Sequence, residues 1–512
     1  MLKLVAIVAV GVLLAVLAYS KYLDSQKDIH ELALSEQSNI SPTRKNDETA
    51  IYRNNQTPHG LPLLTGLQIR HGFKLRNGNL RDIWSIVMGQ KNINSVTFIE
   101  NGNEVKADAY HLNGIFEKLN LFFKDHEIST VGVAVPLYSF HGFVSSFTCF
   151  VNGLTAHHFN HLPRTNPDVD VLMVDEKNLP FALRLDIKLI IVVSQDPLKS
   201  FSQQNVINWN ELGDLTSLNS DTYSYNYDPE YDSGVPFKDT FNFATTDYSH
   251  QNFVSAIASV ARSLPLGHEL SHNDTLLIGY DDSSVKYWAK IFSVLLFGGS
   301  IVVGSSSTLK FDETLIEKYR PTILAIDSKT AKRFFLKHEP KGIIHSLLVS
   351  RVNYLLSRGI FSTMAALNEY KSLRLIYIDQ LNSSNENNSS TELNQIRSLT
   401  GARVISERLI PGVIGSILNT NFYDYRVFTN SKLKNCGTSS LSLEIKLYKY
   451  NGLNIEKRHG ELCIRGFIIG KPNDEKNLEE AIQKGERVGS EGWMPTGIIG
   501  KFGVDGCFYE DQ

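Results

Sequence analysis

The sequence has few cysteines and no excess of basic charge. Four cysteines occur among 512 residues, and no two of them have the C-x-x-C spacing of a zinc or redox site. Cysteines this scattered in a long chain predict free thiols in a reducing compartment, not a disulfide framework. The net charge is -3, so the composition does not favour nucleic acid as a partner.

Several common catalytic motifs are also absent. No serine lies in a G-x-S-x-G elbow, and no G-x-G-x-x-G follows a strand signal. His157, His158 and His161 form an H-H-x-x-H string on an extended segment, without the i, i+4 spacing that places two histidines on one helix face. We interpret this string as a polar turn and expect no metal site.

One long apolar run is present, at the extreme N-terminus. Residues 4–20 carry no charge and are flanked by Lys3 and Lys21. As a helix the run covers about 26 Å, slightly less than a hydrocarbon core of about 30 Å, so lysines at its ends would extend toward the interface. The run predicts a single transmembrane anchor. A cleavable signal peptide is the alternative, because Val16-Leu17-Ala18 and Ala18-Tyr19-Ser20 fit small-residue cleavage sites.

The length of the anchor indicates which membrane it would cross. A short span suits a thin bilayer, so we expect a single pass through the endoplasmic reticulum membrane. The scattered free cysteines favour a body in the cytosol. The lipid droplet and the mitochondrial outer membrane are alternatives, and a cleaved N-terminus would mean secretion. Glycans on Asn55 or Asn273, which lie in N-x-S/T sequons, would contradict the cytosolic orientation.

The rest of the chain alternates strand and helix signals. TVGVAVP at 130–136 and KLIIVVS at 188–194 are typical of buried parallel strands, and an apolar helix over Phe143–Val151 should end at Gly153. After Gly437 the alternating string LSLEIKLYKY predicts a β-rich lobe. We expect an anchor at 1–22, a polar linker at 23–60, an α/β body at 61–430 and the β-rich lobe at 431–512. Residues 214–240 lack periodicity and predict a loop.

The order of these elements, with three local strings, carries a family resemblance. TTDYSHQNFVSAIASV, GELCIRG and GWMPTGIIGKFGVDGCFYEDQ resemble conserved segments of the adenylate-forming superfamily, the AMP-binding enzymes that include acyl-CoA synthetases. The resemblance covers roughly residues 75–512. It implies an α/β fold like the large N-terminal domain of these enzymes, with parallel sheets flanked by helices and a small β-rich lobe.

The resemblance also implies devices that hold ATP and Mg²⁺, and the first is a glycine-rich phosphate loop ending in Pro-Lys-Gly. It should lie just before Thr246, in YDSGVPFKDTFNFATT, where only Ser233, Gly234 and Lys238 match. The glycine run is absent, and Asp239 would repel a triphosphate. We interpret this stretch as an ordinary surface loop.

The second device is a Tyr-Gly-x-Thr-Glu segment that packs on adenine and binds Mg²⁺. Glu407, Arg408, Ile410 and Pro411 stand at its Tyr, Gly, Thr and Glu positions, so the four functional side chains are replaced. Glu407 is open to interpretation as a displaced metal ligand, but a lone glutamate at a strand end is more often solvated.

The third device is the aspartate of Thr-Gly-Asp, which bonds both ribose hydroxyls. Thr496 and Gly497 are kept, but Ile498 replaces the aspartate. Charge-assisted hydrogen bonds contribute about 1.5–3 kcal/mol each, so the replacement should weaken nucleotide binding strongly. The fourth device, the mobile C-terminal domain with the adenylation lysine, is not expected within these 512 residues.

These replacements predict a membrane-anchored, catalytically inactive acyl-CoA synthetase-like protein. We expect no catalytic residues, no metal and no cofactor, and a scaffold or regulatory role through a protein partner or an acyl or lipid ligand in the former acyl pocket. The alternative is a divergent ATP- and Mg²⁺-dependent fatty acid–CoA ligase that needs a partner for the C-terminal domain.

Overall fold

The computed structural model describes most of the chain. The described residues are 2–67, 76–90, 94–100, 103–194, 196, 199–213, 215, 217–241, 244–279, 285–305, 314–336, 342–380, 387–428 and 432–511, without the side chains of 2–9 and 305. The helices are α1 (Leu2–Ser25), α2 (Glu31–Ser35), α3 (Leu80–Met88), α4 (Ala109–Asp125), α5 (Phe140–Asn152), α6 (Leu179–Ala182), α7 (Glu230–Ser233), α8 (His250–Ser263), α9 (Trp288–Leu296), α10 (Thr314–Tyr319), α11 (Ser328–Phe335), α12 (Gly342–Ser357), α13 (Ser390–Thr400) and α14 (Glu475–Arg487).

Within the residues that the structure describes, the strands form two sheets, one of 15 strands and one of 8. The large sheet has the order β1 (Ser38–Ile40), β2 (Tyr52–Asn54), β19 (Leu443–Tyr448), β20 (His459–Gly466), β22 (Met494–Phe502), β23 (Phe508–Asp511), β18 (Leu433–Ser439), β17 (Leu418–Asn419), β16 (Arg403–Arg408), β15 (Leu375–Gln380), β14 (Ile323–Asp327), β12 (Thr275–Gly279), β13 (Ser300–Ser305), β3 (Ser95–Glu100), β4 (Asn103–Asp108). The small sheet has the order β21 (Lys471–Pro472), β11 (Ala244–Tyr248), β10 (Phe237–Phe241), β6 (Thr155–Phe159), β5 (Thr130–Ala134), β7 (Val171–Asp175), β8 (Leu189–Val193), β9 (Val206–Asn208).

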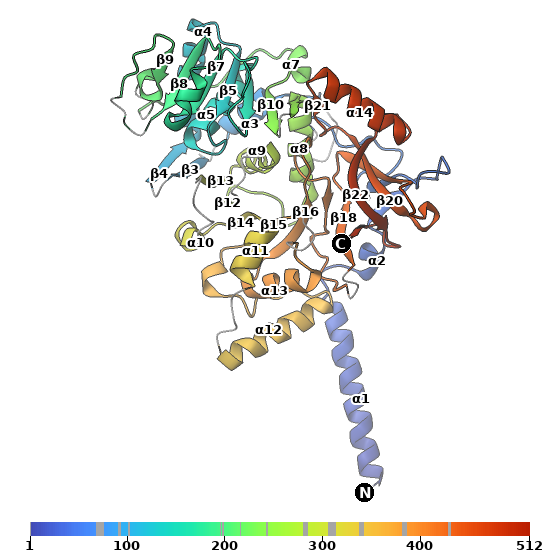
Figure 1. The fold of residues 1–512 in the computed structure, drawn as a ribbon. Helices are drawn as coiled ribbons and strands as arrows, with labels where there is room; N and C mark the ends of the chain where they lie inside the picture. Colours follow the sequence, from blue (N-terminus) through green and yellow to red (C-terminus); the bar gives the residue numbers. More distant parts are fainter. Residues whose placement is uncertain are drawn as a thin grey trace.

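The α/β expectation is confirmed by the strand pairing. Strands β3, β13, β12, β14, β15 and β16 pair in parallel, as do β10, β6, β5, β7, β8 and β9. Helices pack between and around the two sheets (Figure 1). Strands buried on both faces account for the continuous apolar runs in the sequence.

Helix α5 shows how local sequence sets an element at the core. Ser139 accepts a hydrogen bond from the backbone N–H of Gly142 at the start, and Gly153, with φ of +75°, ends the helix in a left-handed conformation. Between these caps the helix is almost wholly buried. Phe147 stacks on Phe116 with ring centroids 5.1 Å apart and contacts Phe292 of α9 at 4.8 Å. The expected helix and its glycine stop are therefore both present.

The β-rich C-terminal part is continuous with the large sheet. Strands β17, β18, β23, β22, β20 and β19 pair antiparallel beside the parallel strands. Helix α14, which the sequence reading did not anticipate, is a charged helix with no buried residues. It lies over this lobe (Figure 1).

The segment that was expected to be a polar linker is folded against this lobe. Strands β1 and β2 pair with each other, and Tyr52 of β2 pairs with Ile445 of β19. The reason is apolar burial that a short, mixed sequence conceals, because Ala50, Ile51 and Tyr52 are all buried. Residues 38–54 are therefore part of the lobe and not a free tether.

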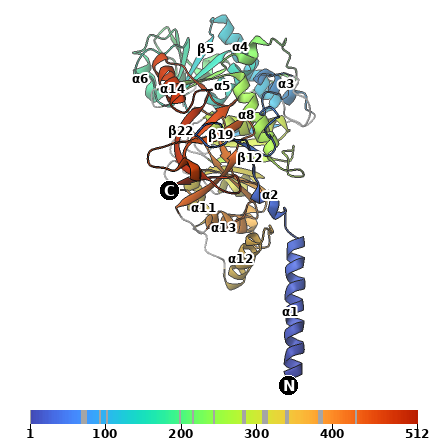
Figure 2. The same cartoon turned by 90° about the vertical axis from the view of Figure 1, so that its right-hand side faces the viewer.

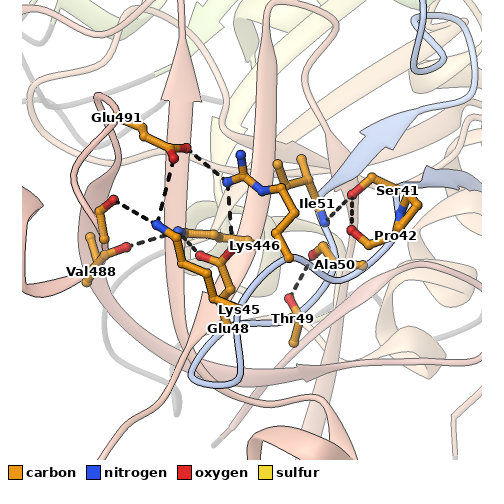
Figure 3. A network of polar contacts seen from close by, with 12 residues as sticks. Ser41, Pro42, Lys45, Glu48, Thr49, Ala50, Ile51, Lys446, Val488 and Glu491 are labelled. Atoms are coloured by element: carbon orange, nitrogen blue, oxygen red, sulfur yellow. Dashed lines mark hydrogen bonds and ion pairs between the residues drawn. The ribbon is translucent and has the colours of Figure 1, made fainter.

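A buried ion pair fastens this segment in place (Figure 3). Lys446 donates to Glu48 at 2.5 Å and to the backbone carbonyl of Val488 at 2.9 Å, and both charged side chains are buried. Arg44 lies 3.0 Å from Glu491 at the rim of the same network. The N-terminal segment and the lobe are thus joined by a desolvated charge pair.

The loop expected over 214–240 is also partly regular. Residues 230–233 form α7, and residues 237–241 form β10, which pairs with β6 and β11. Short elements that draw their stability from neighbouring strands leave little periodicity in the sequence.

Helix α1 projects from the body at the end where α12 lies (Figures 1 and 2). The apolar side chains between Val10 and Leu17 are exposed. The C-terminal part of α1 is docked on the body: Leu23 packs with Leu355 and Ile360, and Asp24 pairs with Arg358 at 3.3 Å. Among the residues whose side chains the structure describes, no helix has both the length and the hydropathy of a membrane span.

Candidate functional site

Three carboxylates lie side by side at the carboxyl edge of the large sheet. Asp327 is the last residue of β14, Asp379 and Glu407 are the penultimate residues of β15 and β16, and the three are lateral partners in the parallel register. In α/β folds, ligands bind at this edge of the strands. Asp327 is engaged locally, because it accepts hydrogen bonds from the backbone and hydroxyl of Thr330 and so caps α11.

Glu407 is paired with a lysine inside the protein. Lys290 of α9 lies 2.7 Å from Glu407, and both side chains are about 97% shielded from solvent, with 2% and 3% exposed. Lys290 also lies 4.9 Å from the ring centre of Tyr377. The expectation of a solvated Glu407 is wrong, because α9 covers the strand end and supplies the counter-charge.

Burial disfavours the charged form of Asp379. Burial raises its pKa to about 6, although the positive charges of Lys286 and Lys290 act in the opposite direction. Lys286 lies 3.5 Å away, and so does the hydroxyl of Tyr287. The edge therefore holds a carboxyl group whose pKa lies above that of an ordinary aspartate.

A cavity of about 340 Å³ opens beside Glu407. Its walls come from Ser259 and Val260 of α8, from Tyr377 and Ile405 in the sheet, and from residues 414–423. The N-terminal segment contributes Ile29, Ala33 of α2, Glu36 and Gln37 to the lining. The lining is mixed, with aliphatic and aromatic groups beside serine, threonine and asparagine.

The other positions of the expected adenine and magnesium segment serve the fold. Arg408 lies 2.8 Å from Glu510 of β23, and both are largely buried. Ile410 is buried in the main core, whereas Pro411 is exposed in a turn. Of these residues, only Glu407 lines the cavity.

In the described part of the stretch expected to hold the phosphate loop, α7, β10 and β11 take most of the positions. Phe241 of β10 pairs with Ala244 of β11, so only two residues join these strands. Residues 234–236 join α7 to β10, and the carbonyls of Gly234 and Pro236 accept hydrogen bonds from His250 and Ala156.

Three residues of this stretch match the expected phosphate loop. Ser233 ends α7, Gly234 follows it, and Lys238 lies in β10. Asp232, next to Ser233, is buried and accepts hydrogen bonds from the backbone of Gly78 and the side chain of Asn79. Lys238 lies within β10, in the small sheet, whereas Glu407 lies in the large one. The earlier interpretation as a surface loop is therefore wrong for residues 237–241.

Thr496, Gly497 and Ile498 lie in β22. The Thr496 hydroxyl donates to the carbonyl of Leu462 at 2.8 Å, and the Gly497 backbone N–H donates to Glu461 at 3.1 Å. Ile498 is buried with the main core cluster. An apolar side chain thus fills the position where the resemblance expects a ribose-binding aspartate.

The histidine string is divided between separate roles. His157 bonds Thr240 at 2.8 Å, and burial, followed by the charge of Lys238, lowers its pKa to about 3. His158 bonds Asp239 at 2.8 Å. Within the described ranges, no three histidine, cysteine, aspartate or glutamate side chains gather as a metal ion would require.

The sequence reading identified Glu407 but missed its surroundings. Lys290, Tyr377 and Asp379 were not singled out, although Asp327 and Asp379 each follow an apolar strand run, TILAI and LRLIYI. That repeated strand-to-carboxylate pattern was a usable signal. The pairing of Lys290 with Glu407, which are 117 positions apart, left no signal in the sequence, because it depends on how α9 crosses the sheet.

Comparison with known proteins identifies a related sequence and similar structures. No family model matches the sequence. The chain is 35% identical over 538 residues to YHR045W, a putative uncharacterized protein of Saccharomyces cerevisiae, with 95% of this chain and 94% of that protein covered. The chain belongs to the family of that yeast protein.

Solved structures show the fold. A luciferase-like enzyme from the mealworm Zophobas morio superposes with a TM-score of 0.60 and 14% identity, covering 88% of this chain and 98% of that one. The N-terminal domain of FACL13 from Mycobacterium tuberculosis gives 0.58 and 13%, covering 85% and 100%. A long-chain-fatty-acid-CoA ligase from Archaeoglobus fulgidus gives 0.60 and 14%, covering 87% of each chain. The family therefore has the adenylate-forming fold, in the form of its N-terminal domain.

The positions where the resemblance expects ATP and Mg²⁺ are occupied by structural contacts in the described residues. Phe241 pairs with Ala244 between β10 and β11, and Ile498 is part of the core. Glu407, the one acidic residue left in the expected magnesium segment, is already neutralised by Lys290.

Proposed function

We propose that this protein is a membrane-anchored, non-catalytic relative of the acyl-CoA synthetases that holds an acyl or lipid-derived ligand and serves a scaffold or regulatory role. The observation that carries the proposal is the two-residue connection between β10 and β11. Adenylation requires backbone N–H groups around the triphosphate, and a connection this short cannot supply them.

The remaining site positions support the same proposal. Where the family resemblance calls for groups that turn toward a nucleotide, this chain has Arg408 in a buried ion pair and Ile498 in the core. Each side chain has a structural partner. A fold that keeps its core while its site positions turn inward is what a non-catalytic descendant would have.

The cavity beside Glu407 supports a ligand-binding role. It combines an apolar wall, with Val260, Ile405 and Ile414, and a polar wall of serine and asparagine side chains. A mixed lining suits a molecule with an aliphatic chain and a polar head. Residues 29–37 contribute to the cavity wall and follow α1 closely in the chain. The same N-terminal segment would therefore contact both the ligand and the membrane.

Anchoring by α1 is the second part of the proposal. It is supported by the uncharged run at 4–20 and by the exposed apolar side chains from Val10 to Leu17. We place the anchor in the endoplasmic reticulum membrane with the body in the cytosol. Four buried cysteines without disulfides are compatible with a reducing compartment. Endoglycosidase sensitivity of Asn55 or Asn273, both exposed, would refute this orientation.

A fluorescent fatty-acid displacement assay tests the ligand proposal. Val260→Trp should fill the cavity and abolish saturable binding. Leu266→Trp, three residues beyond α8 and 86% exposed, should leave binding unchanged. Equal binding by the two variants would refute the cavity as the ligand site.

The buried charge cluster favours one second candidate, a divergent ATP-dependent fatty acid–CoA ligase. Lys290, Asp379 and Glu407 lie where α/β enzymes carry their chemistry. This candidate predicts that Lys238→Ala abolishes function, since Lys238 is the one cation left in the phosphate-loop stretch. The non-catalytic proposal predicts little effect of that substitution on ligand binding.

A further inference from the structure

Helix α12 carries an exposed aliphatic face at the end of the molecule where α1 emerges. Ile343 is 82% exposed, Ile344 78% and Leu347 65%. Across its 16 residues, Arg351 is the single lysine, arginine, aspartate or glutamate. Large aliphatic side chains gathered on one helix and left uncovered mark an interaction surface.

The opposite face of α12 is fixed to the protein. Val352 and Leu356 pack with Ala365 and Tyr425, and Leu355 packs with Leu23 of α1. The exposed face is therefore presented by a helix that is anchored in the core. Its position is set by the fold and not by the membrane.

Contacts with α1 fix the depth of α12. The guanidinium of Arg351 donates to the hydroxyl of Tyr19 and lies over that ring, 5.8 Å from its centre. Tyr19 is the penultimate residue of the uncharged run. Tyrosine and arginine at the end of an apolar helix are typical of the headgroup region of a bilayer. Arg351 and Tyr354 thus lie at the level where α1 would leave the hydrocarbon.

The free end of α12 lies farther toward the membrane side. Its C-terminal residues contact Leu23, so the end away from α1 is the N-terminal end, which carries Ile343, Ile344 and Leu347. In both views this end slopes away from the body, in the direction in which α1 extends (Figures 1 and 2).

We propose that α12 is a second membrane contact, whose aliphatic end enters the interface of the bilayer that holds α1. This inference rests on the proposed anchoring. The occupant is lipid, because the exposed aliphatic end lies on the side of the molecule toward which the apolar α1 extends (Figures 1 and 2). Arg351, one turn beyond Leu347 on the same helix, suits lipid phosphates. Two contacts at an angle hold the body in one orientation, with the N-terminal segment and its cavity close to the surface.

The test uses the full chain in phosphatidylcholine vesicles, with an environment-sensitive fluorophore on single introduced cysteines. The four native cysteines are buried, so the unsubstituted protein gives the labelling background. Leu347→Cys reports on α12, Val12→Cys reports on α1, and Val504→Cys, at a turn that is 98% exposed, is the control. Nitroxide-labelled lipids then measure contact with the bilayer.

We expect fluorescence at position 347 to fall about twofold or more with a nitroxide near the headgroup, and that at position 12 with a nitroxide deep in the acyl chain, with no change at 504. Quenching at 12 without quenching at 347 overturns the α12 proposal and leaves the anchor standing. Quenching at 347 without quenching at 12 overturns the anchor alone. Blue-shifted emission at 347 without lipid quenching assigns the face to another protein surface, such as a second copy, and refutes the proposal.

Introducing negative charge on the same face provides an independent check. Ile343→Glu with Leu347→Glu should remove the lipid quenching of a fluorophore at Tyr354→Cys, whereas Val504→Glu should not. Both glutamates lie on exposed positions, so loss of folding is not expected. Unchanged quenching in the double variant would contradict the proposal.

Discussion

At the carboxyl edge of the large sheet, charged side chains are buried and paired, whereas at the end formed by α1 and α12 aliphatic side chains are exposed. Lys290 and Glu407 lie 2.7 Å apart inside the protein, while Ile343 and Leu347 face outward. A protein that handles a polyanionic nucleotide needs charge open to solvent, and one that lies on a bilayer needs apolar groups open to it. The proposed non-catalytic, membrane-anchored role is based on this contrast.

The largest effect is expected from deleting residues 2–20. Without the uncharged run, the protein should move from the membrane pellet to the supernatant after alkaline carbonate extraction, because no other segment carries so long an apolar stretch. Replacing the run with an unrelated leucine–alanine span of equal length should restore the pellet. Retention of the deleted protein in the pellet would contradict anchoring by α1.

Restoring the family's aspartate should damage the fold instead of restoring nucleotide binding. Ile498→Asp places a carboxylate in the core without a cation, so the free energy of unfolding should fall by about 4–5 kcal/mol. Urea denaturation measures the change, and Ile498→Val, which keeps the apolar character, should cost only about 1 kcal/mol. A stable Ile498→Asp variant that gains ATP affinity would break the comparison.

The buried pair in the N-terminal segment offers the next test. Glu48→Gln leaves Lys446 buried without its counter-charge and should lower the free energy of unfolding by about 3–5 kcal/mol. Asp47→Asn, one residue earlier, breaks the exposed pair with Lys449 and should change it by less than about 1 kcal/mol. Equal effects would mean that residues 38–54 behave as a tether after all.

The smallest effect concerns Asp379 and pH. Since burial raises its pKa from 3.8 to about 6, the folded state binds this proton more tightly, and stability should fall as pH rises from about 4 to about 6 and then level off. Asp379→Asn should remove this slope and raise the free energy of unfolding at pH 7 by about 1–3 kcal/mol. A destabilised variant at pH 7 would show that the ionised form is the one the fold requires.

Sequence reasoning anticipated the parts of the fold that rest on local signals. The parallel strands and the helix ended by Gly153 follow from apolar runs and a left-handed glycine. Strands β1 and β2 could not be predicted in this way. Each has only three residues, too few to show a periodic pattern, and their stability comes from pairing with β19. Helix α14 had a signal in its helix-forming residues and its Glu480–Lys484 spacing, which the reading passed over.

The site was anticipated as a set of replaced positions but not as a structure. The replacement of an aspartate by Ile498 is visible in the sequence, whereas its place in the core is not. The short connection between β10 and β11 depends on the register in which these two strands pair. The charge of Glu407 is balanced by Lys290, which comes from a helix distant in the sequence. Long-range pairing of this kind leaves no spacing to read.

Titration of the full-length protein with a fluorescent ATP analogue and Mg²⁺, followed by a pyrophosphate-release assay with a fatty acid, tests the central claim most directly. The account predicts no saturable nucleotide binding in the micromolar range and no release of pyrophosphate. Micromolar, Mg²⁺-dependent binding with fatty acid-dependent release of pyrophosphate would contradict it and establish the protein as a ligase.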